Sequence, residues 1–96
     1  MERGTDYLPL EEVKDHFDVQ TGNYLLYQSS ANVVGVARVS GVDTSKNFFT
    51  ASNPNKMLVT PIGRCTRKGV VVRGDKSRAE ELALSEGVRE YLLGRK

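Results

Sequence analysis

The sequence predicts one α+β domain, with a short N-terminal helix, an antiparallel sheet of four to six strands and a C-terminal helix packed on the sheet. The 96 residues are the length of a single domain, residues 1–96. The middle of the chain is rich in β-branched and aromatic residues separated by turn signals. Apolar residues repeat at helical spacing near the two ends. A small half-open barrel with terminal helices is the alternative architecture.

The first predicted element is a helix over residues 9–17. Pro9 suits the first helical position, because a backbone N–H at that position has no acceptor within the helix and proline lacks this N–H. Two glutamates follow in the first turn, where carboxylates favour the positive end of the helix dipole. Leu10, Val13 and Phe17 are spaced i, i+3 and i+7, which predicts a narrow apolar stripe.

The predicted strands share β-branched or aromatic side chains and are bounded by polar or glycine-containing turns. They cover residues 24–28, 33–40, 47–51, 56–60, 64–67 and 70–73, the last two being either separate strands or one bent strand. Gly35 and Ala37 lie within the second of these segments. Small residues inside a strand indicate a bend or a close approach of another group.

The last predicted element is a helix that begins at Ser77 and ends at Gly94. Ser77 and Glu80 have the spacing of a capping box, and a glycine is a common residue just after a helix. One apolar stripe is expected to pack on the sheet: Leu84, Val88, Tyr91 and Leu92. An offset second stripe, formed by Ala79, Leu82 and Leu93, exceeds what one sheet face covers and therefore predicts a homodimer. The alternative is that Leu82 and Leu93 are single exposed leucines, which are common on protein surfaces.

The composition is that of a folded soluble chain, with 39% hydrophobic and 27% charged residues. A single cysteine excludes an internal disulfide and favours a reducing compartment. The first residues contain no apolar run typical of a signal peptide, and no run is long enough to span a membrane. The sequence therefore predicts a cytoplasmic protein that does not enter a membrane.

Charge is unevenly distributed along the chain. Residues 1–18 carry a net charge of −4, residues 19–78 carry +7, and residues 79–96 carry −1. The near-neutral total of +2 therefore contains a basic middle between acidic ends. Such a middle segment attracts a polyanion or an acidic protein surface.

The candidate binding residues are basic side chains of this middle segment. They are Arg38, Arg64, Arg67, Lys68, Arg73, Lys76 and Arg78. Guanidinium groups bind phosphates through paired hydrogen bonds, and lysines add point charge. Phe48 and Phe49 are candidates for stacking on bases, although strand alternation places at most one of them in the core. The alternative is that the basic residues are a solvated sheet edge, or are neutralised by the acidic N-terminal segment.

No catalytic, metal or cofactor motif is recognisable. His16 is the only histidine, and its neighbouring aspartates do not face it on a helix. Cys65 lies between arginines but is expected to be a small core residue. The sequence thus predicts a non-catalytic protein without metal or cofactor. Nucleic-acid binding with little sequence specificity is the first expected function, and an adaptor or inhibitor that docks an acidic partner is the alternative.

Overall fold

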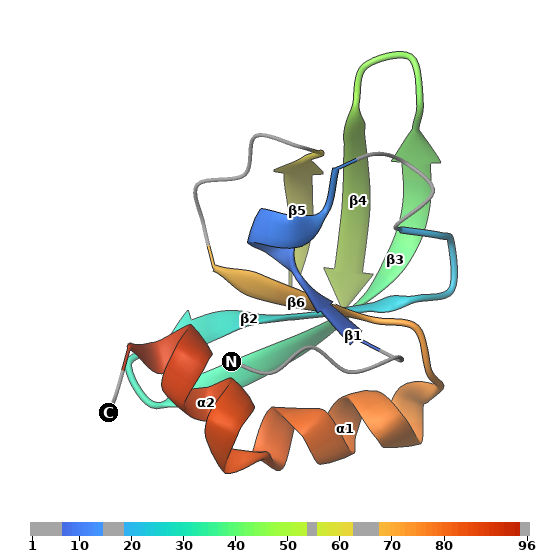
Figure 1. The fold of residues 1–96 in the computed structure, drawn as a ribbon. Helices are drawn as coiled ribbons and strands as arrows, with labels where there is room; N and C mark the ends of the chain where they lie inside the picture. The colour runs from blue at the N-terminus through green and yellow to red at the C-terminus, as the bar shows by residue number, and fades with distance from the viewer. Residues whose placement is uncertain (1–6, 15–18, 54–55, 63–67, 95–96) are drawn as a thin grey trace.

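The computed structural model describes residues 7–14, 19–53, 56–62 and 68–94, and in them a six-stranded antiparallel sheet is followed by two helices (Figure 1). The α+β class and the antiparallel sheet are therefore confirmed. The strands are β1 (Tyr7–Pro9), β2 (Tyr24–Ser30), β3 (Val33–Asp43), β4 (Phe48–Asn53), β5 (Lys56–Pro61) and β6 (Gly69–Val72). The predicted strand over residues 64–67 lies outside the described residues.

The strand order is β1-β6-β2-β3-β4-β5, and every neighbouring pair is antiparallel. Strands β2 to β5 form a meander of hairpins, and β6 returns to pair with β2. In the described part of the chain the sheet is open, with β1 and β5 at its edges. A register shift between Val39 and Gly41 interrupts the pairing of β3 with β4. Such a bulge bends a strand, and in Figure 1 β2 and β6 run across the direction of β4 and β5.

The predicted N-terminal helix is wrong in its described part. Residues 7–9 form the edge strand β1, and Leu10–Glu12 form a single 3-10 turn, η1. Leu10 and Val13 are both buried, because the three-residue spacing of a 3-10 turn also places them on one side. Pro9 is the last residue of this edge strand, a position where a residue without a backbone N–H is tolerated. Residues 15–18, which include Phe17, lie outside the described residues.

The sheet carries a hydrophobic core on each face. The first cluster combines side chains of the sheet with Leu10, Val13 and Val19 of the N-terminal segment. The second cluster places Leu26 and other side chains of the sheet against the helices. Figure 1 shows the two helices on one side of β2 and β6 and η1 on the other. The sheet is therefore the central layer of the molecule.

The C-terminal helix is two helices, α1 (Lys76–Leu84) and α2 (Glu86–Leu93). Ser85 between them is extended, with φ −66° and ψ 134°. The N-cap of α1 is Asp75, whose carboxylate accepts a hydrogen bond from the Arg78 N–H at 2.9 Å, so the predicted cap at Ser77 is wrong. The predicted end is confirmed, because Gly94 adopts the left-handed conformation at φ 70°.

The break between the helices changes which apolar side chains face the sheet. Val88 and Leu92 are buried as expected, but Leu84 is 75% exposed. Ala79 and Leu82, which were assigned to a second stripe, are buried in the core instead. The apolar surface from which a homodimer was predicted is therefore mostly covered within one chain. In the part of the chain that is described, neither helix is long and apolar enough to cross a membrane.

Candidate functional site

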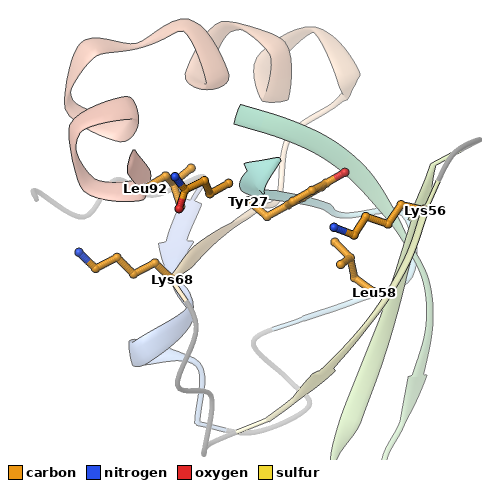
Figure 2. Close-up of a pocket in the computed structure, with 6 residues that line it drawn as sticks. Tyr27, Lys56, Leu58, Lys68 and Leu92 are labelled. Carbon is orange, nitrogen blue, oxygen red and sulfur yellow. The ribbon is translucent and has the colours of Figure 1, made fainter. Parts of the chain in front are cut away.

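A cavity of about 480 Å³ lies where four parts of the chain meet at one end of the sheet (Figure 2). Its lining among the described residues comes from β2, β5, the residue before β6, and α2, and is formed by Tyr27, Gln28, Lys56, Leu58, Lys68 and Leu92. Two of these side chains are cations, and no carboxylate is among them. The cavity therefore favours an anionic ligand over a cationic one.

Tyr27 is held in the cavity wall by its neighbours on both sides. It pairs with Gly35 on β3 and with Gly69 on β6. A Cβ atom on Gly35 would overlap the Tyr27 ring, so the absence of a side chain there lets the ring lie across β3. The Asn53 amide donates a hydrogen bond to the Tyr27 hydroxyl at 2.8 Å. These contacts fix the orientation of the ring before any ligand binds.

Both lysines of the cavity lie over aromatic rings. The Lys56 ammonium is 5.6 Å from the centre of the Tyr27 ring, and the Lys68 ammonium is 5.5 Å from the centre of the Tyr91 ring. Attraction to a ring face orients a cation without neutralising its charge. No carboxylate of the described residues forms an ion pair with either lysine. As far as the described residues go, both positive charges therefore remain available to an anion.

The candidate basic residues predicted from the sequence are divided between the two ends of β6. Lys68 precedes the strand, whereas Arg73 and Lys76 follow it. Five residues of extended chain separate Lys68 from Arg73 by about 16 Å. Arg38 belongs to the second end, because Arg38 pairs with Tyr24, which itself pairs with the last residue of β6. All four of these basic side chains are exposed.

The remaining candidate basic residues contribute less to the described surface. Arg78 forms an ion pair with Glu81 on the next turn of α1, so much of its charge is neutralised. Arg64 and Arg67 lie outside the described residues. Within the described chain, Lys68 is thus the one predicted basic residue that lines the cavity.

The sequence did not identify Lys56, Tyr27 or Gln28 as site residues. Lys56 was expected only as the first residue of a strand after a turn. Its position across the cavity from Lys68 (Figure 2) depends on how the bent sheet places β5 relative to β6, and strand periodicity does not encode that placement. A usable signal was present at Tyr27, since an aromatic residue and a glycine in adjacent strands often pair across a sheet.

The two phenylalanines proposed for stacking have different environments. Phe49 has no exposed surface and belongs to the core, so it offers no face to a base. Phe48 is partly exposed, in agreement with the expectation that the two rings point to opposite faces. Phe48 lines a second cavity of about 410 Å³ at the hairpin between β3 and β4, together with Asp43.

This second cavity is less suited to an anion because it contains a carboxylate. The Asp43 carboxylate accepts hydrogen bonds from the Ser45 hydroxyl at 2.7 Å and from the N–H groups of Ser45 and Lys46 at 3.0 Å. These bonds, the hydroxyl first, hold the pKa of Asp43 below its usual value. Asp43 is therefore charged at neutral pH and acts as the hydrogen-bond acceptor that organises the turn.

Catalytic and metal-binding groups were not expected from the sequence. His16 and Cys65 lie outside the described residues. Elsewhere in the described chain, no three His, Cys, Asp or Glu side chains gather where a metal ion could be held.

The chain was compared with known proteins by sequence and by structure. No protein-family model, no curated protein and no solved structure matches it. The function must therefore be argued from the chemistry of the cavity formed by Tyr27, Gln28, Lys56, Leu58, Lys68 and Leu92, called below the lysine cavity.

Proposed function

We propose that this protein is a small non-catalytic nucleic-acid-binding protein, which binds phosphates at the lysine cavity with little sequence specificity. One observation carries the proposal. Lys56 and Lys68 are distant in the sequence, yet they line one cavity, and no described residue of its lining is a carboxylate. Two cations around a concave surface attract a polyanion and raise its local concentration.

The lysine cavity also has an aromatic residue, Tyr27, beside one of its two lysines. Proteins that bind single strands combine positive charge along the backbone path with aromatic and apolar side chains against the bases. The two lysines supply the charge, and Tyr27 and Leu58, which are 6% and 7% exposed, add a small apolar surface beside Lys56. An acidic protein segment is the alternative partner, because it would use the same two charges.

Binding can be measured by fluorescence anisotropy with labelled single-stranded and duplex oligonucleotides at several salt concentrations. We expect the double variant Lys56→Ala/Lys68→Ala to bind single strands more weakly in every sequence tested. Loss of two phosphate contacts should flatten the slope of log K against log salt by about 1.4, at about 0.7 for each contact.

The matched control is Lys14→Ala/Lys46→Ala, which removes the same charge from exposed positions outside the lysine cavity. This control should keep most of the affinity. Equal losses in the two double variants would contradict a site at the lysine cavity. Labelled poly-glutamate serves as the competing ligand: preferential binding of poly-glutamate would replace the nucleic-acid proposal with an acidic protein partner.

A further inference from the structure

We infer that the open edge of β5 pairs with the same edge of a second copy of this chain, in an antiparallel two-fold arrangement centred on Val59. The inference does not depend on the proposed function. It follows from the direction of the backbone groups of β5, from its exposed side chains, and from the register that both allow. The surface differs from the helix stripe that predicted a homodimer from the sequence.

The backbone of β5 has a row of hydrogen-bonding groups that point away from β4. The Ile62 N–H donates to the Asn47 carbonyl at 2.8 Å, one step beyond the last pair of β4 with β5. Hydrogen-bonded pairs alternate with non-hydrogen-bonded pairs along an antiparallel ladder, so every second residue before Ile62 is bonded to β4. The residues between them are Met57, Val59 and Pro61. Their backbone groups therefore point to the open edge.

In the part of the chain that is described, no other element lies along this edge. β5 is the last strand of the sheet, and β4 is the one described element that packs extensively on it. The register between the two strands has no shift, so β5 is regular and can extend the sheet. Sheet edges that avoid association carry a charge, a proline or a bulge. Residues 57–60 contain none of these.

The exposed side chains of β5 form an apolar row next to these backbone groups. Met57 is 70% exposed and Val59 is 52% exposed. Alternate side chains of a strand share a face, so both lie on the same face as Pro61, which is also exposed. Unpaired backbone groups beside an apolar row are satisfied together by another strand, through ladder hydrogen bonds and cross-strand contacts.

The edge is complementary to itself when two copies run antiparallel about Val59. Each Val59 would exchange both backbone hydrogen bonds with Val59 of the partner subunit. The Met57 N–H would donate to the carbonyl of the partner's Pro61, and the ladder ends there because proline has no N–H. The apolar rows of the two copies would then lie side by side on one face.

Charge and symmetry also fit a second copy. The two Lys56 residues would lie at opposite ends of the paired strands, about 20 Å apart along the strands. At physiological salt the screening length is about 8 Å, so they repel little. A two-fold pairing uses the same edge of both copies and therefore closes at a dimer. One strand from each copy makes a small interface, so the dimer should dissociate on dilution.

The test uses the full chain in sedimentation velocity and in amide hydrogen exchange followed by NMR. The mass should rise from monomer to dimer as the concentration increases about a hundredfold to about 1 mM, the behaviour of a small interface. At the high concentration the amides of Met57 and Val59 should exchange several-fold more slowly than at the low one. The amides of Leu58 and Thr60 should change little, because they are bonded to β4 in both states.

Val59→Lys and Val59→Glu test the two-fold register, because residue 59 lies opposite itself in the dimer. Each variant alone should stay monomeric, since like charges meet at the two-fold axis. An equimolar mixture of the two should restore the dimer. Val33→Lys is the matched control, at a valine of β3 that is 53% exposed, and should keep the parent's dimer. Circular dichroism checks that every variant is folded.

A monomer mass at the highest concentration would overturn the inference. So would a dimer in which the Met57 and Val59 amides still exchange freely, because another surface would then form it. Equal loss of the dimer in Val33→Lys and Val59→Lys would overturn it as well. Protection of these amides in a monomer on addition of a synthetic peptide of alternating threonine and valine would replace the second copy with a peptide ligand.

Discussion

At the scale of single residues, Gly35 decides whether the lysine cavity has its shape. Gly35→Ala places a Cβ atom against the Tyr27 ring and should destabilise the fold by about 1–3 kcal/mol through overpacking. The displaced ring should also move the Lys56 ammonium that lies over it. Urea unfolding measures the free energy, and amide shifts of Lys56 report the displacement.

Gly41→Ala is the matched control for this prediction. Gly41 lies in the same strand, its φ is not positive, and an added Cβ would meet nothing within 4 Å. We expect its unfolding free energy to stay within about 0.5 kcal/mol of the parent. Equal costs at the two glycines would show that strand propensity, and not contact with Tyr27, governs both.

The Asp43 carboxylate gives a pH dependence at the same scale. Its pKa is lowered in the folded state, chiefly by the Ser45 hydroxyl and then by the Lys46 N–H. Its contribution to stability is therefore complete above the pKa of the unfolded chain and is lost as the pH falls through the lower folded pKa. Exchange of the turn amides should accelerate relative to the rest of the sheet in that acidic window. Asp43→Asn should remove the acid-dependent step, and an unchanged step in that variant would exclude Asp43 as its source.

At the scale of elements, the break at Ser85 reverses the burial that the sequence pattern predicts for Leu82 and Leu84. Leu82 is 5% exposed and packs against the sheet, whereas Leu84 is 75% exposed. We expect Leu82→Ala to cost about 2–5 kcal/mol in unfolding free energy. Leu84→Ala should cost less than about 0.5 kcal/mol, measured under the same denaturant conditions. The reverse order of costs would indicate one continuous helix through Ser85, as the sequence pattern predicted.

At the scale of the whole molecule, one sheet couples two separate cores. Leu10 belongs to the cluster on one face, and Leu92 belongs to the cluster on the other. Each alanine substitution should cost about 2–5 kcal/mol. Because the two side chains share no cluster, the double variant should equal the sum within about 0.5 kcal/mol. All variants should unfold in one transition by both fluorescence and circular dichroism. Two transitions would mean that the faces unfold independently.

The strands were predictable because their signal is local. Residues 24–28, 33–40 and 56–60 alternate or concentrate β-branched and aromatic side chains between turn residues, and all three lie in strands. Gly94 was predictable for the same reason, since the left-handed conformation favours glycine. The N-terminal helix was wrong because a three-residue apolar spacing also fits a 3-10 turn, and the pairing of β1 with β6 is a distant contact.

The sequence by itself determined the α+β class, the positions of strands β2 to β6, the helical C-terminal region and the basic charge of the middle segment. These depend on periodicity, turn chemistry and composition, which are properties of neighbouring residues. The tertiary structure alone decided that α1 and α2 are separate, that Leu84 is exposed, and that Lys56 joins Lys68 at one cavity. The burial of a residue and the placement of charges depend on which distant segments the bent sheet brings together. Local sequence patterns do not determine these long-range contacts.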